Sequence, residues 1–177
     1  DQRDLMDGAI ADIAALTFNG QTQQPLPVVT YGTETLVKDV NYTVSYSDGC
    51  TNAGTYTVTV TGTGRYSGSL TKNYTISPFD FSSNLSIVGI DAEYGQTGSA
   101  VHPTPAKVTC AATNNATLEA GTDYELSYSD GCTEPGNYTV TLTGKGNYSG
   151  TKNVTFTILS DYGITVDNGT LTWFDVP

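Results

Sequence analysis

The chain is poor in the residues on which much protein chemistry depends. It has one histidine, His102, three cysteines, and seven basic residues against eighteen acidic ones, for a formal net charge of -11. One histidine and scattered cysteines do not make a zinc site. A nucleophilic triad is unsupported, because no Gly-x-Ser-x-Gly turn is present. The shortage of Lys and Arg argues against nucleic acid as a partner, because phosphate binding needs clustered positive charge.

Long hydrophobic runs are also missing. Hydrophobic residues make up 37% of the chain, and no run approaches the ~20 apolar residues that span a bilayer. We therefore expect no membrane insertion within this fragment. No signal peptide is recognisable, and a chain that starts at Asp1 without Met could be an excised fragment. No acidic loop has the spacing of an EF-hand, so we expect neither a metal nor a cofactor.

What the chain does contain is a long internal repeat. The segment Tyr-Ser-Asp-Gly-Cys-Thr at residues 46–51 returns at 128–133, displaced by 82 positions, and the register holds to residue 158. Repeats of this size are typical of tandem copies of one small domain. A single active site is rarely present twice, so the repeated residues should be scaffold. Specific chemistry should lie where the copies differ.

The three cysteines do not have the spacing of a disulfide framework. Cys50 and Cys132 hold equivalent positions in separate copies. In domains joined end to end they could not bring their Cα atoms within the ~7 Å that a disulfide requires. Cys110 and Cys132 lie in the same copy, and their pairing stays open. We expect free, partly buried thiols.

Apolar residues recur at every second position in both copies. Residues 42–46 and 124–128 alternate in this way, as do the longer runs around 55–61 and 137–143. This pattern predicts half-buried strands. Further strands are expected at 16–18, 28–31, 70–76, 107–110 and 152–158. Residues 47–54 should form a hairpin loop in which Gly49 and Gly54 adopt positive φ. Residues 3–15 should be an irregular lead-in that becomes a strand, or else a short amphipathic helical turn.

Six or seven short strands per copy, without a convincing helix, predict an all-β fold. We expect two tandem Ig-like β-sandwich domains, at residues 1–78 and 79–160. Residues 161–177 should form a C-terminal β-hairpin, because Asp167-Asn168-Gly169 is a strong turn signal. That hairpin is either part of the second domain or the start of a further unit. Residues 77–84 should form the junction, with two aromatic residues that pack instead of moving freely.

The glycine-rich segment at residues 54–68 carries a resemblance to a known family. Its sequence is Gly-Thr-Tyr-Thr-Val-Thr-Val-Thr-Gly-Thr-Gly-Arg-Tyr-Ser-Gly, and residues 118–128 also match the family pattern Leu-x-x-x-x-Asp-Tyr-x-Val-x-Tyr. Residues 36–46 match with Asn41 in place of Asp. Over residues 10–158 the chain resembles the tandem Ig-like repeats of large surface or secreted proteins of anaerobic gut bacteria. The resemblance implies spacer or interaction modules of adhesins, or appendages of secreted enzymes, and brings no catalytic residue.

Several residues that resemble parts of known functional sites have a structural role as their simpler explanation. Gly62, Gly64 and Gly68 resemble a nucleotide loop, but a strand follows them where phosphate binding needs a helix. Tyr66 and Tyr148, which lie within these glycine-rich turns, were expected to bond to the backbone as tyrosine corners. The acidic pairs Asp91 with Glu93 and Asp123 with Glu125 are more typical of surface charge than of a glycosidase.

The candidate ligand-binding residues are the aromatic residues of the unmatched hairpin, which could stack on a sugar ring: Tyr162, Trp173 and Phe174.

The sequence therefore predicts a non-catalytic extracellular stalk or adhesion module, secreted or on a bacterial cell surface. We expect a monomer that is not an enzyme, with a host or bacterial surface protein or glycan as its partner. Two alternatives stay open: a glycan- or protein-binding module, and an accessory domain of a secreted hydrolase.

Overall fold

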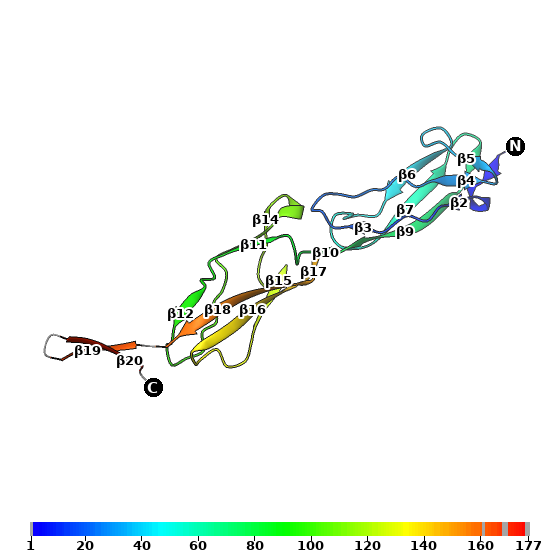
Figure 1. Ribbon diagram of the computed structural model, residues 1–177. Helices are drawn as coiled ribbons and strands as arrows, with labels where there is room; N and C mark the ends of the chain where they lie inside the picture. Colours follow the sequence, from blue (N-terminus) through cyan, green and yellow to red (C-terminus); the bar gives the residue numbers. More distant parts are fainter. Residues whose placement is uncertain (1, 161, 168–169, 176–177) are drawn as a thin grey trace. The chain divides into compact units, whose positions relative to one another are not determined.

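The alternation of apolar and polar residues produces an all-β protein, and the predicted fold class is confirmed. The computed structural model describes residues 2–160, 162–167 and 170–175, with only the backbone of the strands after residue 160 (Figure 1). Internal contacts divide the chain into two compact units, Asp1–Phe79 (unit 1) and Asp80–Pro177 (unit 2). The predicted division at residues 78 and 160 stays a prediction.

Unit 1 is built from strands that form a four-stranded, a three-stranded and a two-stranded sheet. The strands are β1 (Arg3–Asp4), β2 (Ala9–Ile10), β3 (Leu16–Thr17), β4 (Val29–Tyr31), β5 (Glu34–Thr35), β6 (Tyr42–Tyr46), β7 (Gly54–Gly62), β8 (Tyr66–Ser67) and β9 (Ser69–Ser77). The largest sheet has the order β3-β9-β7-β6, the next has β2-β4-β5, and β1 pairs with β8.

The core of unit 1 lies between its two larger sheets. Val58 and Val60 of β7 are fully buried, while the threonines that alternate with them face outward. One buried cluster joins the sheets, because it contains Val60 from β7 and Val29 from β4. Two sheets that share one core form a β-sandwich. Each fully buried apolar side chain contributes roughly 1.5–3 kcal/mol relative to an exposed one.

Unit 2 repeats this arrangement with equivalent strands. They are β10 (Phe79–Asp80), β11 (Leu85–Val88), β12 (Glu93–Gly95), β13 (Lys107–Cys110), β14 (Ala116–Thr117), β15 (Tyr124–Tyr128), β16 (Gly136–Gly144), β17 (Tyr148–Ser149) and β18 (Thr151–Leu159). The sheets are β12-β18-β16-β15, β11-β13-β14 and β10-β17. Residue by residue, β16 has the burial pattern of β7, and β15 has that of β6. Residues that recur in the sequence therefore occupy the same strand positions.

The lead-in at residues 3–15 combines both predicted possibilities. It holds the short strands β1 and β2 and, between them, a single 3-10 turn, η1 (Leu5–Asp7). Asp4 caps this turn, because its Oδ1 accepts a hydrogen bond from the backbone N–H of Met6 at 3.0 Å. The cap turns the chain so that Leu5 enters the core, where it is fully buried.

The expected junction at residues 77–84 contributes to the core of unit 2. Phe81 is fully buried, and its ring centroid lies 6.1 Å from that of Tyr148. Asp80 accepts a hydrogen bond from the N–H of Ser82, as Asp4 does from Met6. Phe81 is thus the counterpart of Leu5, and the prediction that an aromatic residue packs here is confirmed for Phe81.

The hairpin loop after Tyr46 differs from its prediction at one glycine. Gly49 has a φ of 95°, as predicted, but Gly54 lacks a positive φ and begins β7. The second left-handed residue is Cys50, with a φ of 27°, and Cys132 has a φ of 23° in unit 2. The Cys50 thiol donates to the carbonyl oxygen of Ser47 at 3.0 Å. This bond satisfies the buried thiol and holds the loop in a conformation that residues other than glycine adopt rarely.

The predicted tyrosine corner is wrong for Tyr66, whose hydroxyl bonds to side chains, and it stays a prediction for Tyr148. The Tyr66 hydroxyl donates to Glu34 Oε2 at 3.0 Å, and the Tyr148 hydroxyl lies 3.1 Å from Thr113 Oγ1. Each ring is buried in the core. Tyrosines at the ends of β6 and β15 do bond to the backbone. Tyr46 donates to the carbonyl of Pro25 at 2.9 Å, and Tyr128 donates to that of Pro103 at 3.0 Å.

Candidate functional site

The candidate residues in the C-terminal hairpin lie where the structure describes backbone only. Strands β19 (Tyr162–Asp167) and β20 (Thr170–Asp175) form an antiparallel two-stranded sheet, so the predicted hairpin is present. Its register pairs Ile164 with Trp173 and Gly163 with Phe174. The side chains of Tyr162, Trp173 and Phe174 fall outside the described part of the chain, and their role in ligand binding stays a prediction.

In each unit, the strands of the four-stranded sheet that come first and last in the sequence are neighbours and run parallel. In unit 1, Leu16 of β3 pairs with Ile76 of β9, and the N–H of Phe18 donates to the carbonyl of Ser77 at 2.8 Å. In unit 2, Tyr94 of β12 pairs with Ile158 of β18. There the N–H of Thr157 donates to Ala92 at 2.8 Å, and the N–H of Gln96 donates to Leu159 at 3.0 Å. We call each of these the terminal-strand pair of its unit.

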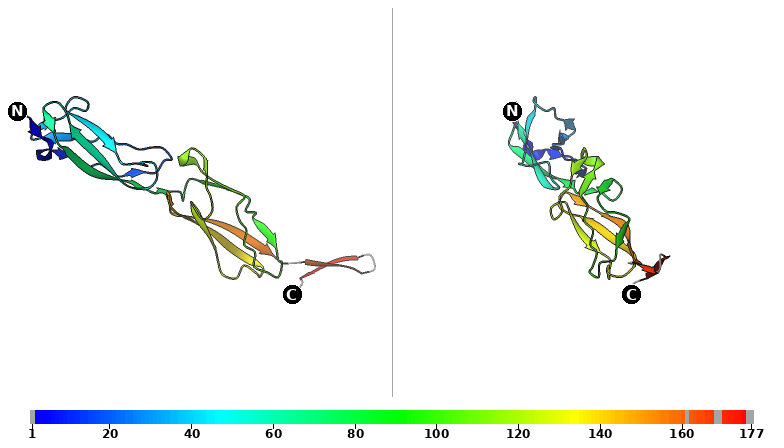
Figure 2. Two further views of the ribbon diagram at one scale, coloured as in Figure 1. Left: turned by 180° about the vertical axis from the view of Figure 1, so that it is seen from behind. Right: turned by 90° about the vertical axis from the view of Figure 1, so that its left-hand side faces the viewer.

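A second parallel pair holds the opposite end of unit 1. Arg3 of β1 pairs with Tyr66 of β8, directly before β9 begins, and its N–H donates to the carbonyl of Arg65 at 2.8 Å. β9 then runs for nine residues, a length of about 30 Å, before the chain leaves the unit after Ser77. The chain therefore enters unit 1 at one end and leaves at the other (Figure 1 and Figure 2).

The outward faces of the two central strands carry no charge in either unit. Sheet register assigns to this outer face eight residues per unit, all of them Thr, Ser or Asn. In unit 1 they are Thr55, Thr57, Thr59, Thr61, Ser69, Thr71, Asn73 and Thr75. In unit 2 they are Asn137, Thr139, Thr141, Thr143, Thr151, Asn153, Thr155 and Thr157. Such residues fit a pleated, solvated surface and hydrogen bond across strands.

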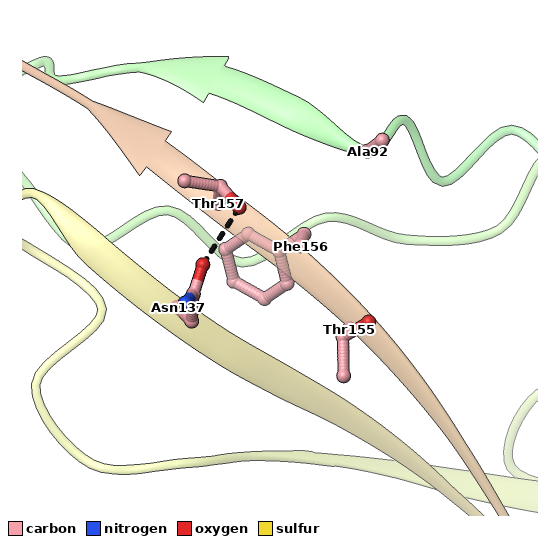
Figure 3. Close-up of a pocket in the computed structure, with 5 residues that line it drawn as sticks. All are labelled: Ala92, Asn137, Thr155, Phe156 and Thr157. Carbon is pink, nitrogen blue, oxygen red and sulfur yellow. Dashed lines mark hydrogen bonds between the residues drawn. The ribbon is translucent and has the colours of Figure 1, made fainter.

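A pocket of about 380 Å³ lies against this face in unit 2. Figure 3 shows its lining: Ala92 directly before β12, Asn137 on β16, and Thr155, Phe156 and Thr157 on β18. The hydroxyl of Thr157 donates to Asn137 Oδ1 at 2.8 Å. Phe156 is 1% exposed, and its ring packs in the core against Tyr94 and Tyr138, on the opposite side of β18 from Thr155 and Thr157. The pocket therefore presents mainly hydroxyl and amide groups, with Ala92 as an apolar neighbour. Asn137 and Thr155 are exposed.

Some charged residues of the described chain form surface ion pairs. Lys145 Nζ lies 2.6 Å from Glu125 Oε1, and Lys72 Nζ lies 2.7 Å from Asp12 Oδ1. The hydrogen bond from each lysine holds the pKa of its carboxyl partner below the usual value. Glu125 is therefore held in its charged form by a neighbour, which suits the surface role predicted for it.

Arg3 contacts side chains from several strands of unit 1. Its guanidinium lies 3.1 Å from Glu34 Oε2 and 5.5 Å from the centre of the Tyr31 ring. The hydrogen bond with Tyr66 is the main cause that raises the pKa of Arg3. These contacts tie β1 to β5 and β8, and they indicate a structural role.

His102 and the cysteines are also held by structural contacts. The His102 ring is exposed and stacks on the Tyr128 ring at a centroid distance of 4.3 Å. All three cysteines are free and buried. Across residues 2–160 and the two following strands, no group of three or more His, Cys, Asp or Glu residues is arranged to hold a metal ion.

Comparison with known proteins does not identify the chain. No protein-family model matches it, and no curated protein sequence matches it. None of the helical segments within the described residues is long and apolar enough to cross a membrane. Inferences about function therefore rest on the sequence pattern and on the geometry above.

Proposed function

We propose that the chain is a load-bearing, non-catalytic module of an extracellular bacterial surface protein, in which each unit acts as a rigid spacer. The terminal-strand pairs are the observation that carries this proposal. When two parallel strands at the start and end of a domain are pulled apart along their length, the hydrogen bonds between them are loaded together. A ladder loaded in this way resists more force than one opened bond by bond.

The entry and exit of the chain support the same role. In unit 1 the chain enters at the β1 end and leaves about 30 Å away, at the end of β9. A pull on the two ends therefore acts along β9, first across the pair that β1 forms with β8 and then, once β1 and β2 are released, across the pair that β3 forms with β9. The resemblance to Ig-like repeats of bacterial surface proteins implies the same use, with the chain secreted or on the cell surface as a monomer.

Single-molecule force spectroscopy tests this function directly. The chain is held by its two ends and stretched, and each unit of roughly 80 residues should release about 250 Å in one abrupt event. Gln96→Pro removes the N–H that donates to Leu159. This variant should lower the force of one of the two events and leave the other unchanged.

Gln96→Ala is the matched control, because it loses the side-chain bond to Glu134 but keeps the backbone N–H. Its unfolding forces should equal those of the unaltered chain. If Gln96→Pro unfolds at unaltered force, or if both units yield without a resolvable force peak, the load-bearing role is wrong.

A further inference from the structure

We infer that the pocket around Asn137 binds an uncharged sugar residue of a glycan, a function separate from load bearing. The pocket lies on the outer face of unit 2, formed by β16 and β18 next to the start of β12. Its volume of about 380 Å³ is at the lower end of the ~300–1,000 Å³ usual for small-molecule sites. That size suits a small ring and not an extended peptide.

The hydrogen-bonding groups in the pocket are held in place before a ligand arrives. The Thr157 hydroxyl donates to Asn137 Oδ1 at 2.8 Å, which fixes the plane of the Asn137 amide. With its oxygen engaged, the amide presents its NH₂ group, a donor of two hydrogen bonds. Thr155 adds a hydroxyl that donates and accepts. A ring with several hydroxyl groups can bond to both, while the Ala92 methyl group provides apolar contact.

The charges around the pocket decide against an ionic ligand. None of the five lining residues is charged, and the eight outer positions at which β16 and β18 pair are Thr and Asn. The nearest carboxylate in the sheet register is that of Glu93, which pairs with Thr157. With a chain charge of -11, an anionic sugar would be repelled. A cation would find a single exposed carboxylate. A neutral, hydroxyl-rich ligand is the remaining match.

The two units differ in this feature, which supports specific recognition. At the position equivalent to Asn137, unit 1 has Thr55, and Thr155 is replaced by Asn73. Unit 1 keeps an Asn–Thr bond, but one row along the sheet: the Thr57 hydroxyl donates to Asn73 Oδ1 at 2.9 Å. Asn73 therefore provides a matched control, because it is also exposed and makes the same kind of bond.

The test measures binding of neutral and acidic oligosaccharides by NMR titration of the whole chain. The neutral probes are the hexasaccharides of cellulose, xylan, mannan and starch, and the acidic probe is hexagalacturonate. At least one neutral probe should shift the side-chain NH₂ signal of Asn137 in a saturable manner. Asn137→Asp keeps the size and the acceptor but removes the donors, so it should weaken binding about tenfold or more, the loss of one hydrogen bond.

Two further variants separate binding from folding. Thr157→Val keeps the shape but removes the hydroxyl that positions Asn137, and it should also weaken binding. Asn73→Asp in unit 1 should leave the dissociation constant unchanged, and thermal melting should confirm that all three variants fold. The inference is overturned if the NMR shifts do not saturate with any neutral probe by about 10 mM, because a dissociation constant above that concentration is too weak for specific recognition. It is equally overturned if Asn137→Asp binds as the unaltered chain does, or if hexagalacturonate binds as well as the neutral probes.

Discussion

The matched valines Val58 and Val140 allow a strict test of whether the two units fold independently. Both are fully buried, at the same position of β7 and β16. In the sheet register Val58 lies between Tyr46 and Lys72, and Val140 lies between Tyr128 and Val154. The change to alanine removes two methyl groups from a closed core in each case, without altering a hydrogen bond.

The size of the effect follows from this burial. The loss of two buried methyl groups costs about 1.6 kcal/mol in transfer free energy, and the cavity raises the total to roughly 2–3 kcal/mol. A unit of about 80 residues has a stability of about 4–12 kcal/mol, so each variant should still fold. Its own melting temperature should fall by roughly 10–20 °C.

Differential scanning calorimetry resolves the outcome. Val58→Ala should move one unfolding transition and leave a second at its original temperature, while Val140→Ala should move the second and leave the first. The double variant should show the sum of both changes, since distant sites add within about 0.5 kcal/mol. One transition that moves as a whole in both single variants would refute independent folding. Val58→Asp places a carboxylate in the same closed site and should unfold unit 1 completely.

Three other predictions concern Tyr74, Gly68 and the buried cysteines. Burial raises the pKa of Tyr74 above its ordinary value of 10.0, so the folded state retains a proton that the unfolded state loses. The stability of unit 1 should therefore be complete below about pH 10 and fall as the pH rises further, as urea titrations at pH 8 and 11 would reveal. Gly68→Ala should destabilise unit 1 by about 1–2 kcal/mol, because Gly68 has a φ of 78° and an added Cβ would lie 2.5 Å from Asp4 Oδ1. Urea denaturation measures this, and an unchanged midpoint would contradict the contact. The buried thiols of Cys50, Cys110 and Cys132 should react with a thiol reagent only under denaturing conditions. Rapid labelling of the native chain would contradict their burial.

Most strands that the sequence predicts are long enough to show a period of two, although the two-residue β3 is also predicted and the four-residue β11 is not. The alternation at residues 42–46 and 107–110 matches β6 and β13 residue for residue. Shorter strands such as β1, β5 and β8 contain two residues each, and two residues carry no period. Their positions depend on partners far along the chain, as when Arg3 pairs with Tyr66. Local patterns do not encode such pairings.

The repeat was found only where insertions had not broken its register. The displacement of 82 residues links Val58 to Val140, but Asp4 and Asp80 are 76 apart. Their equivalence becomes visible in the structure, because both cap a turn and both strands, β1 and β10, pair with the two-residue strand inside the glycine-rich turn of their unit. An alignment of the two copies with gaps before residue 36 would match Asp4-Leu5 with Asp80-Phe81. In each case an aspartate precedes a large hydrophobic residue.

The pocket around Asn137 could not be predicted because it needs three strands in register. Ala92 and Asn137 are 45 positions apart, and only the parallel pairing of β12 with β18 brings them to one site. One signal was available in the sequence. At three outer positions the copies exchange Thr and Asn, since Thr55, Thr71 and Asn73 in unit 1 correspond to Asn137, Asn153 and Thr155 in unit 2.

This exchange separates what the fold requires from what it permits. At inward positions the copies keep Val58 as Val140 and Ile76 as Ile158, because a closed core tolerates little change in volume. At outward positions the core imposes no such limit, and threonine suits a strand better than asparagine does. Neither packing nor strand propensity therefore accounts for an asparagine at position 137. If the Asn137→Asp and Asn73→Asp variants differ in glycan binding but not in stability, recognition is the reason for the asparagine. If they agree in both, the exchange is neutral variation on a scaffold.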